Sequence, residues 1–480
     1  MKKTVSCIAL ATLLSLLVSC ETQTRKIIYF SVNGEEYSAF ISENDTIDLK
    51  TLSTEFNAKI TISDPSYFDE IKINGVNLSS GHTEIPIKMI SRDSFLKMTW
   101  KREGYNGTYY LRTLHSDVPQ PSETSKKTSN GDFYLSFVNI RLIEKIDNEG
   151  KILFYRYDPI PKDEIDSTKC PGWWDFKKHV INDTIYYSYH APDTKFYDQG
   201  FPGYNPGMRI ILNQYYQPID MLQLLASRGD TIQAGDPIDG HDFFMIDRNH
   251  YIMSSYIKIG TVYAAYLQEV NNGEVKFDWL STDYKDMTNW LDPAFAPDSG
   301  NIQQDYVHFN SIDVLPDGNW LCSFRHISSI LKINRNSGKG EIMWRIAGAE
   351  DSLYSFHGQH YVRYHEGDNS ITLFNNGNLP DSIGRTQMLR LNVDTCTGKV
   401  LKSTVLHDDG YFTQACGALT FSGKNMIVGW GIPGDTTNVN CNRILSEYDE
   451  NGNEVFRMRF EQNNSSMNQY LGSYRCVKCE

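Results

Sequence analysis

The chain has 480 residues, too many for one ordinary domain, and its 40% apolar content provides side chains for more than one buried core. Its 29 tyrosines and 23 phenylalanines favour strands over helical bundles and argue against a disordered chain. A formal net charge of -13 excludes a general nucleic-acid-binding protein, because affinity for a phosphate backbone depends on clustered lysine and arginine.

The N-terminal residues predict export. Two lysines precede a mostly apolar stretch over residues 4–18, which leads into Leu17-Val18-Ser19-Cys20, a pattern typical of a secretory signal peptide over residues 1–19. The last four residues resemble a bacterial lipobox, which implies that Cys20 carries a lipid, with a plain cleaved signal as the alternative. No other apolar run approaches the ~18 residues that a spanning helix needs. We therefore expect a lipoprotein of the cell envelope, on the periplasmic side or the outer-membrane surface, held to the membrane only by this lipid.

Residues 25–114 fall into short runs in which apolar and polar side chains alternate. Turn signals such as Asn33-Gly34 and Asn74-Gly75 separate these runs. We therefore predict a small N-terminal β-sandwich over residues 20–116. Residues 117–130 contain Pro, Ser, Thr and Lys with almost nothing apolar, which predicts a linker.

A self-similar unit recurs after the linker. Each copy has a turn glycine before a predicted outer strand, and these glycines are Gly150, Gly273, Gly338, Gly398 and Gly452. The first gap is about twice the others, so we place a degenerate copy near residues 209–214. Predicted hairpins span residues 180–187, 246–253, 315–322, 365–372 and 421–428. Six units of about four strands predict an all-β fold, a six-bladed β-propeller over residues 131–480. Residues 218–227 alone have a helical pattern.

Seven cysteines would remain once Cys7 has left with the signal peptide and Cys20 has been acylated, and one sequence does not reveal their pairing. Cys476 and Cys479 form a C-x-x-C motif without the strand and helix expected around a redox centre. We therefore favour a structural or frayed thiol pair.

Three of the twelve histidines have near-equivalent places in consecutive units. His241, His308 and His360 each precede the turn of their own hairpin by seven to ten residues. The first strand of a propeller blade lies nearest the axis, so three imidazoles should converge at one mouth of the channel. Arg325 lies on the returning arm of the hairpin that contains His308 and should neighbour it. The alternative for Arg325 is a buried counter-ion to a carboxylate such as Asp313.

Three imidazoles and one guanidinium suggest a site for a single anionic group, held by charge-assisted donors and reached by a nucleophile. A three-histidine zinc site is the competing interpretation. The sequence contains neither H-x-H nor H-E-x-x-H, and the nearby arginine would repel a cation. We therefore predict no metal and no cofactor. The G-x-x-x-x-G-K-[ST] loop of nucleotide-binding enzymes is also absent.

Six short motifs follow one another in the same part of the chain. They are Gly240-His241-Asp242-Phe243, His308-Phe309-Asn310-Ser311-Ile312-Asp313, Ser323-Phe324-Arg325-His326, Trp344-Arg345, Gly358-Gln359-His360 and Thr372-Leu373-Phe374-Asn375-Asn376-Gly377. In this order they resemble the motifs of bacterial aryl-sulfate sulfotransferases, and the resemblance covers most of the chain after the linker. A sandwich followed by a six-bladed propeller also matches that family. Residues 199–232 and the first units depart from the family pattern.

The resemblance implies that a sulfuryl group moves from a phenolic sulfate ester to a phenolic acceptor, without the nucleotide carrier PAPS and with ping-pong kinetics. It implies that His360 is the nucleophile and forms a transient sulfohistidine. His308 and Arg325 would stabilise the sulfuryl oxygens. His241 would protonate the leaving phenol and later deprotonate the acceptor, and Asn310 would be a further donor to the substrate.

Other histidines lie close to these in the sequence. We prefer His360 to His357 as the nucleophile because of its Gln-His motif and its place in the hairpin. We expect His326 to point to the opposite face from Arg325, because neighbours alternate in a strand, and His365 to be solvated in a turn. Two other functions stay open: a non-catalytic propeller lipoprotein that binds a ligand or a protein, and a hydrolase or lyase with a histidine-bound metal.

Overall fold

The computed structural model describes most of the chain, in segments separated by short gaps. These segments are residues 27–32, 35–40, 44–49, 55–78, 82–88, 96–113, 118–119, 121–124, 131–158, 172–201, 203–214, 216–295, 305–351, 353–379, 384–434, 443–460 and 472–479. The predictions for the signal peptide and Cys20 lie outside the described residues. The chain divides into two compact units, Met1–Ser116 and Asp117–Glu480. None of the helices in the described segments has the length and apolar character needed to span a membrane.

Two sheets make up the described part of the first unit. The first sheet has the order β2 (Glu35–Phe40), β1 (Ile27–Val32), β4 (Glu55–Ile62) and β7 (His82–Lys88). The second has the order β3 (Asn44–Leu49), β9 (Tyr105–Thr113), β8 (Leu96–Arg102), β5 (Glu70–Ile73) and β6 (Val76–Asn77). β3 pairs with β9 in parallel, and a short 3-10 helix η1 (Pro65–Tyr67) precedes β5. Both sheets contribute to one core, Phe30 and Ile60 from the first and Met98 and Tyr109 from the second.

The described part of the second unit contains six sheets of four or five strands and one two-stranded sheet. The first three sheets are β13 (Ile152–Asp158), β12 (Arg141–Ile146), β11 (Asp132–Phe137) and β36 (Ser473–Cys479); β14 (Trp174–Ile181), β15 (Thr184–Pro192), β16 (Gly207–Leu212) and β17 (Pro218–Leu222); and β18 (Phe243–Asp247), β19 (His250–Ile259), β20 (Val262–Asn271) and β21 (Glu274–Leu280). The next two are β22 (Phe309–Val314), β23 (Trp320–Phe324), β24 (Ser329–Ile333) and β25 (Ile342–Ala347); and β26 (His360–His365), β27 (Ser370–Asn375), β28 (Gln387–Val393) and β29 (Val400–His407). The sixth is β10 (Pro121–Thr124), β35 (Glu454–Phe460), β34 (Arg443–Tyr448), β32 (Asn425–Gly429) and β31 (Ala418–Ser422), and the small sheet is β30 (Thr413–Ala415) with β33 (Ile432–Pro433). Short 3-10 helices lie between strands: η3 (Thr194–Gln199), η4 (Ser281–Asp283), η5 (Lys285–Trp290), η6 (Pro293–Phe295) and η7 (Glu366–Asp368).

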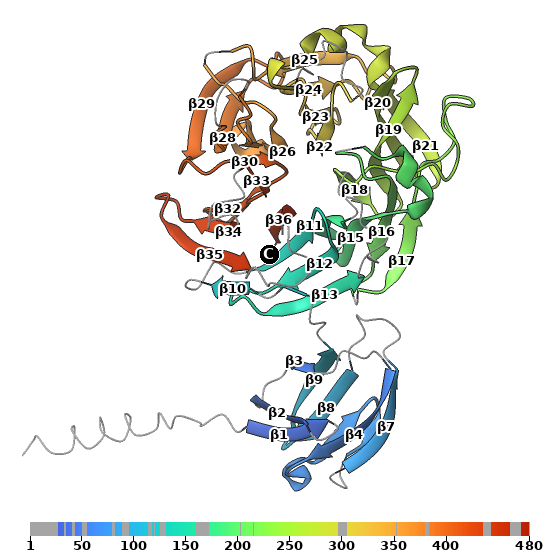
Figure 1. The fold of residues 1–480 in the computed structure, drawn as a ribbon, viewed down its shortest axis with the longest axis vertical. Coiled ribbons are helices and arrows are strands. Elements are labelled where there is room, and N and C mark those ends of the chain that lie inside the picture. Colours follow the sequence, from blue (N-terminus) through green and yellow to red (C-terminus); the bar gives the residue numbers. More distant parts are fainter. Residues whose placement is uncertain are drawn as a thin grey trace, which may run out of the picture. The chain divides into compact units, whose positions relative to one another are not determined.

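The six larger sheets are arranged around a common centre (Figure 1). β14, β18, β22, β26 and β31 are the first strands of their sheets in chain order, apart from the edge strand β10, and each contacts the next. β36 contacts both β31 and β14, and thereby joins the two ends of this series. We refer to these six strands as the inner strands.

The repeated sequence pattern corresponds to this arrangement. Every turn glycine predicted to precede an outer strand does so, and the strands that follow are β13, β21, β25, β29 and β35. The five predicted hairpins are β14–β15, β18–β19, β22–β23, β26–β27 and β31–β32. The degenerate copy near residues 209–214 contains β16. Because each pattern describes only local turn chemistry, it locates the hairpins without specifying which sheets are neighbours.

Two predictions about individual segments were wrong. Within the predicted helix, residues 218–222 form the edge strand β17. Within the predicted linker, residues 121–124 form β10, which pairs with β35; an edge strand needs a partner on one side only and tolerates proline at its first position. The C-x-x-C motif was predicted to be a structural or frayed thiol pair, and its place in β36, where both cysteines pair with β11, fits the structural alternative. Cys476 is buried and forms no disulfide.

A buried ionic network connects inner strands of five sheets. Its central group is Asp242, which directly precedes β18. Its Oδ1 accepts hydrogen bonds from Lys177 of β14 at 2.7 Å and from Arg475 of β36 at 3.1 Å. Its Oδ2 accepts from Arg363 of β26 and from the backbone N–H of Ile312 of β22, each at 3.0 Å. One carboxylate thus contacts groups from four neighbouring inner strands.

A second buried carboxylate, Asp175 of β14, completes the network. It pairs with Arg475 at 2.6 Å and with Arg209 and Lys177 at 2.9 Å each. Burial alone would raise the pKa of Asp242, but Arg363, Lys177 and Arg475 together hold it well below its ordinary value. Buried charges are tolerated only when they are paired and hydrogen-bonded, as here.

Candidate active site

Each of the three predicted histidines lies at the start of an inner strand. His241 precedes β18 by two residues, His308 directly precedes β22, and His360 is the first residue of β26. All three are buried, with exposed fractions of 3%, 5% and 2%. The ring centroids of His241 and His308 lie 4.8 Å apart. His241, His308 and Arg325 also contribute to the electrostatic environment of His360, so the four groups share one site.

Arg325 neighbours His308, as its place in the hairpin predicts. Its backbone N–H donates to the His308 carbonyl at 2.7 Å. Its guanidinium donates to the Gln414 carbonyl at 3.0 Å and stacks over Phe295 at 4.4 Å from the ring centroid. Burial lowers the pKa of Arg325 to about 10, which leaves it cationic at neutral pH. Asp313 is not its counter-ion, because this carboxylate accepts the backbone N–H of Tyr364.

The Arg325 cation is available to an anion. Within the described part of the chain, no carboxylate forms an ion pair with it, and its Nε has no hydrogen-bond partner. A guanidinium with an unused N–H can hold an oxyanion through a charge-assisted hydrogen bond. The sequence predicted such a guanidinium, available to a single anionic group.

Two buried aspartates that were not predicted from the sequence hold two of the histidines. Asp239 Oδ2 accepts both Nδ1–H of His241, at 2.7 Å, and its backbone N–H, at 3.0 Å. Asp305 makes the same pair of bonds with His308, through its Oδ2 to Nδ1 and its Oδ1 to the backbone N–H. Each aspartate lies two or three residues before its histidine, so the spacings D-G-H and D-Y-V-H were the available signal.

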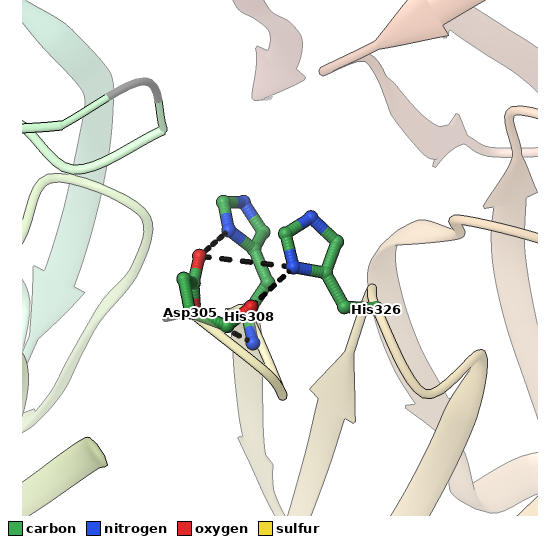
Figure 2. A group of neighbouring side chains, drawn as sticks. All are labelled: Asp305, His308 and His326. Carbon is green, nitrogen blue, oxygen red and sulfur yellow. Dashed lines mark hydrogen bonds and ion pairs between the residues drawn. The ribbon is translucent and has the colours of Figure 1, made fainter. Parts of the chain in front are cut away.

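His326 also belongs to this site, contrary to the prediction. Its ring lies 4.5 Å from that of His308, centroid to centroid, and its Nδ1–H donates to the Asp305 carbonyl at 2.6 Å. Figure 2 shows both imidazoles with their Nδ1 atoms directed at Asp305. The alternation of side chains along a strand does not apply to His326, because β23 ends at Phe324 and His326 lies in the turn that follows.

Asp305, His308 and His326 are close enough to share a metal ion, since their ligating atoms lie within 4.8 Å of one another. Hydrogen bonds already account for this proximity, because Asp305 accepts from Nδ1 of both rings. A metal bound at the two Nδ1 atoms would displace both Nδ1 protons, and it would lie near the charge of Arg325, which contributes to the environment of both rings. The donor set therefore fits a hydrogen-bonded triad better than a metal centre.

His360 is held differently from the other two histidines. Its Nδ1 lies 2.7 Å from Oδ1 of Asn376 and 3.1 Å from the carbonyl of Gly358. Its Nε2 accepts the backbone N–H of Cys416 at 3.3 Å. Burial and the charge of Arg325 lower the pKa of His360 well below its ordinary value. His360 is therefore neutral at physiological pH.

The two histidines nearest His360 in sequence lie in different surroundings. His357 donates from Nδ1 to Asp292 at 2.7 Å, and its backbone N–H donates to Asn375. His365 at the far end of β26 is half-buried rather than solvated, and its Nε2 lies 2.8 Å from the Thr372 hydroxyl.

Asn310 is completely buried beside this site. Its amide nitrogen donates to the carbonyl of Gln359 at 2.6 Å, which connects β22 to the residue before His360. Its Oδ1 has no hydrogen-bond partner within the described residues. The part of Asn310 that remains for a substrate oxygen is therefore the second N–H of its amide.

The divergent stretch over residues 199–232 contributes one contact to the site. Gly203 has a φ of +94°, and a Cβ there would lie 2.5 Å from Cε1 of His308. Only glycine combines this backbone conformation with such close approach to the imidazole. The sequence could not reveal this role, because the contact joins two different sheets.

Aromatic rings surround the histidines. Trp174 lies 5.5 Å from His241 and stacks on Tyr474 at 4.7 Å, measured between ring centroids. Tyr256 lies 6.2 Å from His308. Such rings favour planar apolar ligands over compact hydrophilic ones.

A family model for arylsulfotransferases (ASST) matches residues 194–461, which is more than half of the chain. The chain belongs to the arylsulfotransferase family. This confirms the resemblance that the six motifs indicate, and every histidine of the site lies in the matched region. No curated protein matches the chain.

Several solved structures are similar to this chain at low sequence identity. A protein of unknown function from Bacteroides caccae is 11% identical with a TM-score of 0.44, over 73% of this chain and 99% of that one. A periplasmic gluconolactonase from Pseudomonas aeruginosa is 9% identical with a TM-score of 0.39, over 73% and 99%. A quinonprotein alcohol dehydrogenase-like protein from Bacteroides thetaiotaomicron is 11% identical with a TM-score of 0.34, over 90% and 96%.

Proposed function

We propose that the protein is an aryl-sulfate sulfotransferase, which moves a sulfuryl group from a phenolic sulfate ester to a phenol without PAPS. The observation that carries this proposal is the shared buried site of His241, His308, His360 and Arg325 in a chain of the arylsulfotransferase family. The donor and the acceptor would be small aromatic molecules, and the reaction needs neither a metal nor a cofactor.

The transfer would occur in two steps. In the first, the Nε2 lone pair of His360 attacks sulfur, an N–S bond forms, the bond from sulfur to the phenolic oxygen breaks, and His241 gives that oxygen a proton. In the second, His241 takes the proton from the acceptor hydroxyl while its oxygen attacks sulfur and the N–S bond breaks. Donors placed around the transferring group would supply the largest share of the lowering of the barrier. Arg325, His308 and the second N–H of Asn310 are the proposed donors.

We also propose the type of fold of each unit and the place of the protein in the cell. We interpret the six large sheets as a six-bladed β-propeller, supported by the closed series of contacts between inner strands. We interpret the first unit as a β-sandwich, supported by the core that its two sheets share. The signal peptide over residues 1–19 would direct export, and the lipid on Cys20 would hold both units at the cell envelope.

Release of 4-nitrophenol from 4-nitrophenyl sulfate tests the proposed activity. We expect release only when a phenol is present as acceptor, with formation of the acceptor's sulfate ester. Saturable binding of aryl sulfates without any product, across a panel of phenols, would refute the transferase and favour the non-catalytic binding protein. Parallel lines in a double-reciprocal plot would support the stepwise route, because donor and acceptor then react at separate times.

Gly203→Ala is expected to lower kcat/KM by about tenfold to a hundredfold, because its Cβ would displace the His308 imidazole and small misplacements in active sites have effects of this size. The rate of 4-nitrophenol release with saturating phenol measures this. Gly260→Ala is the matched control, since Gly260 also has a positive φ of +61° but no atom within 4 Å of the place that a Cβ would occupy. Equal loss in both variants would contradict the role of the His308 contact.

Chelation separates the transferase from the metal-dependent alternative, which the triad of Asp305, His308 and His326 would favour. We expect full activity after dialysis against EDTA, and no stoichiometric metal by elemental analysis. Activity that disappears with EDTA and returns with zinc would overturn the metal-free mechanism.

A further inference from the structure

We infer that the group bonded to Nδ1 distinguishes the proposed nucleophile His360 from the proposed acid His241, and that Asn376 is the positioning residue that keeps the reactive lone pair of His360 on Nε2. None of the roles proposed so far includes Asn376. This inference rests on the proposed function, because it concerns which atom attacks sulfur.

The orientation of the Asn376 amide is determined by its surroundings. The side chain is fully buried, and its nitrogen donates to the carbonyls of Thr413 at 3.0 Å and Cys416 at 3.1 Å. Carbonyl oxygens only accept hydrogen bonds, so the nitrogen must face these two groups. Its Oδ1 must therefore face His360, 2.7 Å from Nδ1.

The orientation of the amide decides the tautomer of His360. Both groups at Nδ1, Oδ1 of Asn376 and the carbonyl of Gly358, are acceptors, so Nδ1 carries the hydrogen. In a neutral imidazole the other nitrogen then holds the lone pair. The backbone N–H of Cys416, 3.3 Å from Nε2, is consistent with this assignment because it donates to that lone pair. When Nε2 attacks sulfur, this N–H lies beside the new bond and can donate to a sulfuryl oxygen.

His241 has the opposite arrangement. Its Nδ1 donates to the charged carboxylate of Asp239, whereas Nδ1 of His360 faces a neutral amide and a backbone carbonyl. A charged ring can donate a proton but cannot attack sulfur. The hydrogen bond to the neutral amide of Asn376 by itself raises the pKa of His360, but burial and the charge of Arg325 outweigh it and keep the ring neutral, which suits a nucleophile. The proposed acid thus has an aspartate bonded to its Nδ1, and the proposed nucleophile has an asparagine bonded to its Nδ1.

Three groups near His360 lower the pKa of its ring. The groups that contribute are Arg325, His241 and His308, and each disfavours a proton on His360. The backbone N–H of Cys416 also contacts the ring, at Nε2. His360 is therefore expected to stay neutral, and hence nucleophilic, in mildly acidic solution.

Nitrogen NMR of the full-length protein with 15N-labelled histidine tests the inference directly. The His360 signals are identified by their loss in His360→Gln. We expect a protonated Nδ1 and an unprotonated Nε2 in the wild-type protein at neutral pH. A protonated Nε2 on His360 would overturn the inference.

Variants of Asn376 test its role. Asn376→Ala leaves Nδ1 only the longer bond to Gly358, so we expect the second tautomer to appear and kcat to fall by about tenfold to a hundredfold with little change in KM. Asn376→Asp places a carboxylate at Nδ1, as Asp239 does for His241, so we expect Nε2 of His360 to become protonated at a higher pH than in the wild-type protein. Asn375→Ala is the matched control, because the neighbouring buried asparagine accepts backbone N–H groups of His357 and Gly377 and does not contact His360.

The outcomes separate this inference from the proposed function. If no phenol accepts a sulfuryl group, the proposed function fails whatever the tautomer. If transfer occurs but the wild-type spectrum shows a protonated Nε2, or if the Asn376→Ala and Asn375→Ala spectra of His360 are the same, the inference alone fails.

Discussion

His360→Gln is expected to reduce sulfuryl transfer by about 10⁴-fold or more, because loss of a nucleophile removes the covalent route and leaves only the contribution of binding. Initial rates of 4-nitrophenol release with phenol as acceptor measure this loss. Intact-mass analysis after brief exposure to an aryl sulfate provides a second measurement. The wild-type protein should gain one SO3 group on His360, and the variant should gain none.

His365→Gln is the matched control for this experiment. It makes the same substitution at the other end of β26, where the imidazole contacts Thr372 instead of the site. We expect its rate to remain within about twofold of the wild-type rate, as for changes remote from a site. Substantial transfer by His360→Gln, or sulfation of His357 in the wild-type protein, would show that the nucleophile has been misassigned.

Asp242→Asn is expected to destabilise the second unit by about 3–5 kcal/mol, because it removes one carboxylate from a buried network and leaves the cations around it without their partner. Denaturant unfolding followed by tryptophan fluorescence measures this change, since all tryptophans except Trp100 lie in the second unit. Asp283→Asn is the control. That carboxylate pairs with Arg228 at the surface and should contribute less than about 1 kcal/mol.

The pH dependence of this difference is a separate check. The folded-state pKa of Asp242 is lowered, so its contribution to stability is present above the unfolded pKa, about 3.9, and is lost as pH falls towards the folded value. The difference in unfolding free energy between wild type and Asp242→Asn should therefore shrink below about pH 4. A difference that grows with falling pH would contradict the assigned ionic role.

The parts of the fold that could be predicted depend on residues close together in the sequence. Gly273 and Gly338 mark turns before outer strands, and the Pro316-Asp317-Gly318 turn separates β22 from β23. Repetition of such turns is enough to count the units. Distance from the hairpin turn also predicted equivalent strand starts for His241, His308 and His360, and it located Arg325 beside His308.

The parts that could not be predicted depend on contacts between distant segments or on the exact end of a strand. His326 was assigned to the wrong face because the end of β23 at Phe324 was not known. Asn376 directly follows β27 and contacts His360 at the start of β26. Its orientation depends on Thr413 and Cys416, which come after the last strand of that sheet in the sequence. Gly203 acts through a contact between sheets, and β10 acquires its strand structure only by pairing with β35.

The pairing of β36 with β11 also governs when the second unit can fold during synthesis. A ribosome makes β11 and β12 long before β36, so the first of the large sheets cannot acquire its inner strand until β36 has emerged. The pairing of β10 with β35 imposes a similar delay. A chain that is still being made therefore lacks the cooperative closure of its ring, and Asp242 lacks the guanidinium of Arg475. This delay would keep the ring of inner strands open until β36 has been made, as the proposed export through a protein-conducting channel would require.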